Sequence, residues 1–336
     1  MSVEDIAVVG AGSYGSCLAM LFGRAGHRVS LWARNAETAS AMQESREAAA
    51  YLPGHRLPST VTVTSDLEAA VRGKRFIVGV TPSHGIREVL GRAALWLDPE
   101  AIVINASKGL EDGTLMTIDQ VYAEIFPRQI AERATYLSGP TFATEIAAGL
   151  PAAIVLAGRD DPTTTAAQEA LTSLHFRIYR TDDVIGVLTG GALKNVVAIG
   201  AGISDGLGFG SNTRVALMTR GLAEIARVGV AMGANPMTFA GLSGMGDLVL
   251  TCSGDASRNR RVGLALGQGK KMPEILAEMR QVAEGVKTAK VAKELAEKLG
   301  VDAPIIDAMY CIIHEGVPVR DAITKLLTRA VRSERD

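Results

Sequence analysis

The chain has few cysteines and almost no net charge, and each of these absences excludes a class of protein. Its three cysteines, Cys17, Cys252 and Cys311, are odd in number, widely spaced and without a CxxC pair. This argues against a disulfide framework and a zinc cage, and favours a reducing cytosol. The formal charge of −1 provides no broad field to hold nucleic acid or an anionic membrane, so any anion site must be local.

The sequence also lacks targeting and membrane signals. The opening residues MSVEDIAVVG are acidic and run directly into an apparent strand, so we expect no secretory signal peptide. No stretch reaches membrane-span length without Lys, Arg, Asp or several glycines interrupting it, so we expect no integral membrane association. We expect no bound metal, because no ligand spacing is present among His27, His55, His84, His175 and His314.

A change of pattern divides the 336 residues into two expected domains. Short β-rich runs alternate with helical patterns as far as residue 180; they are IAVVG, HRVSLWA, VTVT, FIVGV, AIVINA, ATYLS, AAIVLA and FRIY. They predict an α/β fold over 1–183, with a mainly parallel, doubly wound Rossmann-type sheet. Beyond it, Ala, Leu, Gly and Met at helical spacing predict an all-α domain over 184–336. Crevices between domains are common ligand sites.

A glycine-rich turn closes the first predicted strand and opens a helix. The sequence GAGSYG provides Gly10 for a tight turn, Gly12 for close approach to a pyrophosphate and Gly15 for helix packing. The helix N-terminus would face the anion. The alternative is a glycine-rich turn in a domain that binds no nucleotide.

Arg34 follows the second predicted strand, where an acidic residue would hold the ribose hydroxyls of NAD. A guanidinium at this point could pair with the 2′-phosphate of NADP, although an ordinary exposed arginine is the alternative. We therefore expect NADP(H) to be accepted, without NAD(H) being excluded.

Lys194 is the only charged residue between Asp183 and Asp205. One helical turn away lie Gly190 and Gly191, so we expect room for a small molecule beside its amine. A buried lysine loses its proton easily, as an acid or base in catalysis must. The alternative is a lysine that reaches water along its methylene stem.

Further polar residues lie where predicted strands end. Lys108 follows AIVINA and is placed to be a second cation, unless it is a surface lysine. Thr141, in GPTFA after ATYLS, can cap the helix that runs to Gly149, where free amides could meet cofactor or substrate. A plain cap explains Thr141 equally well.

Two motifs in the helical half carry charge. Asp247 and Thr251 are spaced to share one helical face, and Lys194 is the expected partner of Asp247, although an aspartate that complements a helix dipole is the alternative. Downstream, SRNRR begins with a predicted N-cap at Ser257. Arg258 and Asn259 then lie in the first turn, where they can bind phosphate. Two further arginines, Arg260 and Arg261, are expected on a solvated face.

Taken in order, GAGSYG, SKG, GPTFA, GGALKNVVAIGAG, GDLVLTC and SRNRR resemble bacterial NAD(P)-dependent glycerol-3-phosphate dehydrogenases over essentially the whole chain. The resemblance implies a Rossmann domain followed by a helical substrate domain like the C-terminal domain of 6-phosphogluconate dehydrogenase. It also implies reversible reduction of dihydroxyacetone phosphate to sn-glycerol 3-phosphate for phospholipid synthesis, with NADP(H) or NAD(H).

The resemblance carries over to individual residues. It implies cofactor contacts from the glycine loop and from Ser13, Tyr14, Arg34, Lys108, Ala143, Arg258, Val282 and Glu284. It implies substrate contacts from Lys108, Gly139, Thr141, Lys194, Asp247, Ser257, Arg258 and Asn259. The family assigns proton transfer to Lys194, and the expected catalytic group also includes Lys108, Asp247, Thr251 and Asn195.

Reduction of a ketone requires a donor for the growing negative charge on its oxygen, and Lys194 as ammonium supplies both charge and proton. We expect Lys108 to lower the proton affinity of Lys194 and Asp247 to oppose this effect.

Two other functions are alternatives. One is that of another dehydrogenase of this architecture, acting on a hydroxy acid or a ketopantoate-like acid, which would need carboxylate recognition. The other is a cofactor-sensing protein without turnover. The apolar helical half makes a homodimer plausible.

Overall fold

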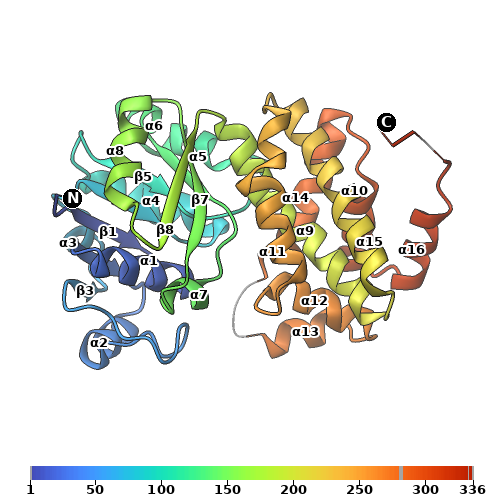
Figure 1. Ribbon diagram of the computed structural model, residues 1–336, viewed down its shortest axis with the longest axis horizontal. Helices are drawn as coiled ribbons and strands as arrows, with labels where there is room; N and C mark the ends of the chain where they lie inside the picture. Colours follow the sequence, from blue (N-terminus) through green and yellow to red (C-terminus); the bar gives the residue numbers. More distant parts are fainter. Residues whose placement is uncertain (1, 280–282, 332, 335–336) are drawn as a thin grey trace.

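The computed structural model describes residues 2–279, 283–331 and 333–334. The chain forms two lobes side by side, one built around a sheet and the other of helices alone (Figure 1). The strands of the first lobe are β1 (Asp5–Val9), β2 (Arg28–Trp32), β3 (Val61–Thr64), β4 (Phe76–Gly79), β5 (Ile102–Asn105), β6 (Thr135–Ser138), β7 (Ala152–Gly158) and β8 (Phe176–Thr181). They coincide with the eight predicted runs, whose ends differ from theirs by two residues at most.

The strands form one sheet in the order β3-β2-β1-β4-β5-β6-β7-β8. Pairing is parallel throughout except between β6 and β7. Along β1, Ile6 and Val8 belong to one apolar cluster, whereas Ala7 and Val9 belong to another. Since successive strand residues point to opposite faces, the sheet is covered on both sides, as a doubly wound fold requires. The predicted Rossmann-type fold class is therefore confirmed.

Helices and short 3-10 turns connect these strands. They are α1 (Ser13–Arg24), α2 (Ala36–Ser45), α3 (Leu67–Val71), η1 (Ser83–Gly85), α4 (Ile86–Ala93), η2 (Ala94–Trp96), α5 (Ile118–Ile125), α6 (Arg128–Glu132), α7 (Ala143–Ala147) and α8 (Asp161–Leu171).

The second lobe follows β8 and contains helices only among its described residues. Its elements are α9 (Val184–Gly206), α10 (Gly210–Ala231), η3 (Pro236–Ala240), the π-helical turn η4 (Leu242–Gly246), α11 (Asp247–Ser253), α12 (Arg258–Gly267), α13 (Met272–Glu278), α14 (Glu284–Leu299), α15 (Pro304–His314) and α16 (Val319–Leu327). The expected all-α architecture is confirmed.

Helix α9 is the central element of the second lobe. It begins after Asp183, whose carboxylate accepts a hydrogen bond of 2.9 Å from the Gly186 amide, and it contacts α10, α11, α12, α14 and α15. In the described part of the chain it is the one helix long and apolar enough to cross a membrane, and 94% of that stretch is buried inside the protein. Its apolar surface is therefore covered by its neighbours.

Glycines allow α9 and α12 to pack backbone against backbone. A Cβ at Gly202 would overlap the carbonyl oxygen of Arg260, and a Cβ at Gly263 would overlap that of Ile199. Because neither position tolerates a side chain, the two helices have a fixed register along one another.

Candidate active site

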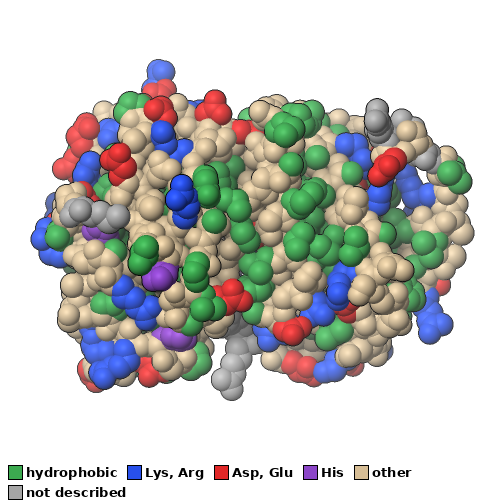
Figure 2. Space-filling model, viewed as in Figure 1, with side chains coloured by type: hydrophobic (Ala, Val, Ile, Leu, Met, Phe, Trp, Pro, Cys, Tyr) green, Lys and Arg blue, Asp and Glu red, His purple; other side chains and the backbone are tan. Residues whose placement is uncertain are grey.

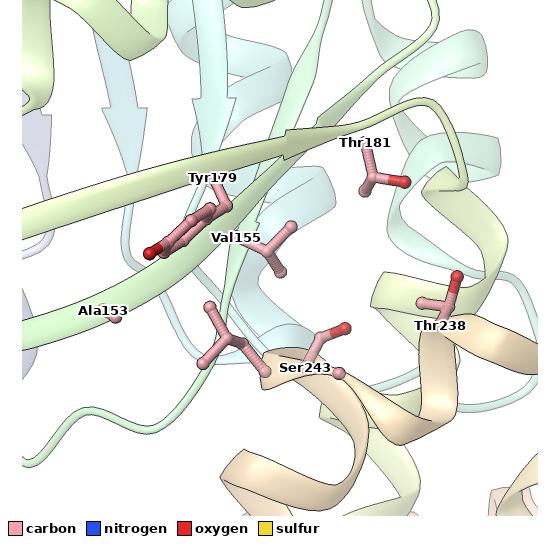
Figure 3. A pocket seen from close by; sticks show the side chains of 8 residues that line it. Ala153, Val155, Tyr179, Thr181, Thr238 and Ser243 are labelled. Atoms are coloured by element: carbon pink, nitrogen blue, oxygen red, sulfur yellow. The ribbon is translucent and has the colours of Figure 1, made fainter.

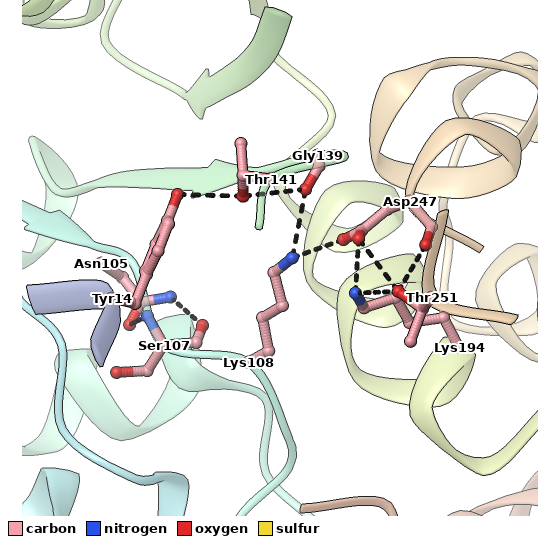
Figure 4. A network of polar contacts seen from close by, with 9 residues as sticks. All are labelled: Tyr14, Asn105, Ser107, Lys108, Gly139, Thr141, Lys194, Asp247 and Thr251. Atoms are coloured by element: carbon pink, nitrogen blue, oxygen red, sulfur yellow. Dashed lines mark hydrogen bonds and ion pairs between the residues drawn. The ribbon is translucent and has the colours of Figure 1, made fainter. Parts of the chain in front are cut away.

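Lys194 lies inside the helical lobe and does not reach solvent, since its side chain is only 7% exposed. Its ammonium donates to Oδ1 of Asp247 and, at 2.7 Å, to Oγ1 of Thr251 (Figure 4). Thr251 in turn donates to the carbonyl oxygen of Asp247 at 2.6 Å. The expected pairing of Lys194 with Asp247 is present, and so is the shared helical face of Asp247 and Thr251.

A second cation reaches the same carboxylate from the sheet lobe. Nζ of Lys108 donates to Oδ2 of Asp247 at 2.5 Å and to the carbonyl oxygen of Gly139 at 3.2 Å (Figure 4). Asp247 also begins α11, so it both pairs with cations and lies at a helix N-terminus. Two ammonium groups from different lobes thus share one buried carboxylate.

The electrostatics of this cluster tune Lys194. Burial lowers the pKa of Lys194 to about 8, because desolvation disfavours the charged ammonium. The Asp247 carboxylate opposes this change, whereas the positive charge of Lys108 adds to it. Lys194 can therefore both hold and release a proton near neutral pH.

A buried asparagine orders the turn that carries Lys108. Nδ2 of Asn105 donates to the carbonyl oxygen of Ser107 at 2.8 Å, and the Ser107 amide donates to Oδ1 of Asn105 at 3.2 Å. The Ser107 hydroxyl donates to the carbonyl oxygen of Thr81 at 2.5 Å (Figure 4 shows Asn105 and Ser107). Sequence reasoning missed this support; the signal was a polar residue ending an apolar strand just before SKG.

The glycines beside Lys194 do not leave an open space, and that expectation was wrong. A Cβ at Gly190 would lie 2.7 Å from the carbonyl oxygen of Ser243 in η4, and one at Gly191 would lie 2.8 Å from Oγ of Ser138 at the end of β6. These glycines allow protein segments, rather than a ligand, to approach α9 closely.

The glycine loop between β1 and α1 has the shape of an anion cradle. Gly10 has φ of +126°, which favours glycine, and a Cβ at Gly15 would overlap the carbonyl oxygen of Gly10. A Cβ at Gly12 would meet nothing within 4 Å, and Gly12 occupies the cap position just before α1, where no side chain caps the helix. The amides of the first turn of α1 are thus accessible from the Gly12 side, and the loop fits a pyrophosphate.

Thr141 is not a helix cap, so that prediction was wrong. Helix α7 begins at Ala143 with Phe142 in the cap position. The Thr141 hydroxyl instead contacts the Tyr14 hydroxyl at 3.2 Å and the carbonyl oxygen of Gly139 at 3.3 Å (Figure 4). Thr141 therefore links the first turn of α1 to the Gly139 carbonyl oxygen, which also accepts from Lys108.

The predicted cap at Ser257 is confirmed, since its hydroxyl oxygen accepts a hydrogen bond of 3.2 Å from the Arg260 amide. Arg258 and Asn259 occupy the first turn of α12, and Oδ1 of Asn259 accepts from the Gly285 amide at 2.9 Å. The expectation that Arg260 lies on a solvated face was wrong, because its side chain is 12% exposed and bound to Asp205.

The other predicted residues lie around this centre. Arg34 follows β2 and pairs on the surface with Glu88 at 3.2 Å. Ser13, in the first turn of α1, donates to the carbonyl oxygen of Tyr51 at 2.8 Å. Asn195 is buried next to Lys194 on α9. Val282 lies outside the described residues.

Glu284 begins α14, and burial raises the pKa of its carboxyl group. The charges of Arg258, Lys108 and Lys194 oppose that rise. Its carboxyl group therefore interacts electrostatically with the cations of both lobes, and it belongs to the same polar region.

A pocket lies away from these residues, between the sheet and the π-helical turn η4. It has a volume of about 460 Å³ and is lined by Ala153, Val155, Tyr179, Thr181, Thr238, Gly241, Leu242 and Ser243 (Figure 3). A smaller pocket of about 190 Å³ adjoins Thr141 and Phe142. Over the described ranges, no group of three or more His, Cys, Asp or Glu side chains could hold a metal ion.

Two family models match most of the chain. The NAD-dependent glycerol-3-phosphate dehydrogenase N-terminus matches residues 5–164, and the C-terminus of the same family matches residues 183–324. The glycerol-3-phosphate dehydrogenase (NAD(P)+) of Geobacter sulfurreducens is 52% identical and aligns over 99% of each chain. That of Myxococcus xanthus is 46% identical and aligns over 97% of this chain and 98% of its own.

Solved structures agree with these sequence matches. Glycerol-3-phosphate dehydrogenase from Coxiella burnetii superimposes with a TM-score of 0.93 at 38% identity, covering 97% of this chain and 99% of that chain. A ketopantoate reductase from Ralstonia eutropha, at 16% identity and a TM-score of 0.60, covers 96% of this chain and 99% of its own, and shares the fold alone. The chain therefore belongs to the NAD-dependent glycerol-3-phosphate dehydrogenase family.

Proposed function

We propose that this chain catalyses the reversible reduction of dihydroxyacetone phosphate to sn-glycerol 3-phosphate with NADP(H) or NAD(H), which provides the glycerol backbone of phospholipids. The observation that carries the proposal is the buried Lys194 ammonium, which shares the Asp247 carboxylate with Lys108. A sensor that only bound cofactor would have no use for such a group. Family membership supports the substrate.

Lys194 is the proton donor in this proposal. Its ammonium meets the negative charge that develops on the carbonyl oxygen and then transfers a proton to that oxygen. When bound, the nicotinamide supplies the hydride. Lys108 strengthens the positive field, while Asp247 and Thr251 hold the Lys194 amine in place. In the reverse direction neutral Lys194 accepts the alcohol proton, and Asn195 completes the catalytic group.

The cofactor would lie along the glycine loop, with its pyrophosphate over Gly12 and the first turn of α1. We assign a 2′-phosphate contact to Arg34, because it follows β2 and is largely exposed. The remaining proposed cofactor contacts are Gly10, Ser13, Tyr14, Gly15, Lys108, Ala143, Arg258 and Glu284, together with Val282.

We assign the substrate phosphate to the first turn of α12. Ser257 caps this helix, Arg258 supplies a guanidinium, and Asn259 is fixed by its bond to α14. Gly139 and Thr141 would complete the substrate site, beside Lys108. Since charge-assisted bonds to phosphate orient the ketone as well as bind it, neutral dihydroxyacetone should be a poor substrate.

We further propose that the chain divides into functional units at residue 183, that it works in the cytoplasm and that it forms a homodimer. Hydrophobic side chains lie on one face around the junction of the lobes and over the adjoining part of the helical lobe (Figure 2), which supports self-association. Sedimentation equilibrium tests the proposed homodimer, and a monomer at micromolar concentration would contradict that proposal.

The reaction is tested by following loss of nicotinamide absorbance when purified protein meets NADPH or NADH and dihydroxyacetone phosphate. We expect turnover with this ketone, and little with dihydroxyacetone, ketopantoate or a 2-keto acid. Turnover only with a carboxylate substrate would favour a hydroxy-acid dehydrogenase. Cofactor binding without turnover of any ketone would favour a cofactor-sensing protein that catalyses no reaction.

A further inference from the structure

Arg260 forms a charge network, centred on a buried pair with Asp205, just beyond the proposed phosphate site. Its Nε and Nη2 donate to Oδ2 of Asp205 at 2.9 and 2.7 Å, and its Nη1 donates to Asp255 at 2.8 Å. Asp205 also accepts from Nη1 of Arg214 at 3.0 and 3.2 Å. The side chains of Arg260 and Asp205 are only 12% and 11% exposed, so solvent screens this pair weakly.

The backbone of Arg260 is held as firmly as its side chain. Its amide donates to the Ser257 hydroxyl, and its carbonyl oxygen packs against Gly202 of α9, where no side chain fits. Asp205, on the next turn of α9, then binds the guanidinium. Two separate contacts, one of the backbone and one of the side chain, therefore hold the start of α12 against α9, and the Ser257 cap orders that turn itself.

This arrangement sets where the phosphate site lies relative to Lys194. Both Lys194 and Asp205 belong to α9, and the pair between Asp205 and Arg260 adds to the glycine packing that sets the register of α12 along that helix. Arg258 and Asn259 precede Arg260 in the same turn of α12. A shift of α12 would move them away from a phosphate whose ketone lies at Lys194.

We propose that Arg260, held by Asp205, is a positioning residue that presents Arg258 and Asn259 to the substrate phosphate without binding that phosphate itself. The proposal rests on the phosphate site assigned above. The Arg260 guanidinium already donates to the buried Asp205 and to the exposed Asp255, so a phosphate would have to compete with these carboxylates.

The variant D205N separates a positioning role from direct binding, because the two roles predict opposite signs. If Arg260 positions the turn, D205N releases it, and both the KM for dihydroxyacetone phosphate and the Kd for inorganic phosphate rise. If Arg260 binds phosphate directly, freeing it from Asp205 strengthens binding, and the Kd for inorganic phosphate falls. A fall in Kd would overturn the proposal.

The variant R260Q should raise KM and Kd together by about tenfold or more, since displacements near 1 Å are costly in such sites. We expect kcat to change much less, because Lys194 is untouched, and R260K to restore part of the lost affinity. The matched control is R214Q, which removes the other partner of Asp205 and leaves α12 in place. It should keep KM near that of the unaltered protein even if its melting temperature falls.

The measurements are steady-state kinetics at saturating NADPH, calorimetric titration of inorganic phosphate into the complex with NADPH, and thermal melting. Loss of melting temperature in D205N and R260Q with unchanged KM and Kd would show a merely structural role and overturn the proposal. Phosphate titration needs no turnover, so it tests the positioning role of Arg260 even if the proposed reaction fails, and the two failures can be told apart. If the unaltered protein bound no phosphate, the proposal would also fail.

Discussion

Replacing Lys108 by methionine should raise the pH at which Lys194 loses its proton. The two lysines donate to the two oxygens of one Asp247 carboxylate, so their ammonium groups repel one another across it. The pKa of Lys194 is lowered to about 8, mainly by burial, and Lys108 contributes to that lowering. Methionine keeps the unbranched apolar stem and removes the charge.

The size of the effect follows from Coulomb's law. Two unit charges about 4 Å apart repel by about 4 kcal/mol at an effective dielectric constant of about 20. This would lower a pKa by about three pH units at most, since one unit corresponds to about 1.4 kcal/mol. Lys108 keeps 16% of its side chain exposed, so solvent screens part of the repulsion. We expect the pKa of Lys194 to rise by about one pH unit or more, towards the ordinary lysine value of about 10.4.

Two assays report this midpoint. The kcat of ketone reduction requires the ammonium form, so it should fall as pH rises through the pKa of Lys194. Titration of lysine Cε signals by NMR gives the same pKa without turnover. The matched control is Lys290→Met, which removes one positive charge from the surface of α14, where Lys290 is 48% exposed. An unchanged midpoint in the Lys108 variant would refute the reasoning, and an equal rise in both variants would assign the effect to net charge.

Three further predictions concern proton transfer, the glycine loop and a buried carboxyl. Lys194→Ala should keep NADPH affinity but lose about 10²- to 10⁴-fold in kcat; near-normal turnover would remove Lys194 from the mechanism. Gly12→Ala should keep its melting temperature and bind NADPH more weakly, whereas Gly15→Ala should melt lower, because its Cβ overlaps backbone; equal melting curves would contradict this. Burial raises the pKa of Glu224 to about 7, from about 4.3 when unfolded. Below pH 4 the Glu224 carboxyl group is protonated in both the folded and the unfolded protein. As the pH rises it ionises first in the unfolded protein, so it should lower the free energy of unfolding by about 3 kcal/mol by pH 7. Denaturant titrations of Glu224→Gln should lack that decline; an identical pH profile would refute the assignment.

Local signals were enough to predict the sheet. Each strand is a run of Val, Ile, Ala or Thr between turn residues, and the positions of β1 to β8 follow from those runs. The antiparallel β7 could not be predicted, because periodicity within a strand is the same in both directions. Asn35 caps α2 by accepting from the Thr38 amide at 2.8 Å; this cap was not predicted from the sequence.

The site was predictable where spacing along one helix determines contact. Asp247 and Thr251 share a face for that reason, and a lone buried Lys194 needed an anion. Contacts between elements were not predictable. Thr141 and Arg260 were misjudged because their partners, Tyr14 and Asp205, come from distant segments that tertiary packing brings together.

The burial of α9 has a consequence for how the chain is made. On a ribosome the helix emerges before α12, α14 and α15, which cover it in the finished protein. At about 5 to 20 residues per second, the covering helices take several seconds to follow. During that interval an apolar segment long enough to enter a membrane is exposed. The segment that carries Lys194 therefore depends on the later helices for its burial, and substitutions that slow the docking of α12 should reduce the yield of folded protein before they alter its chemistry.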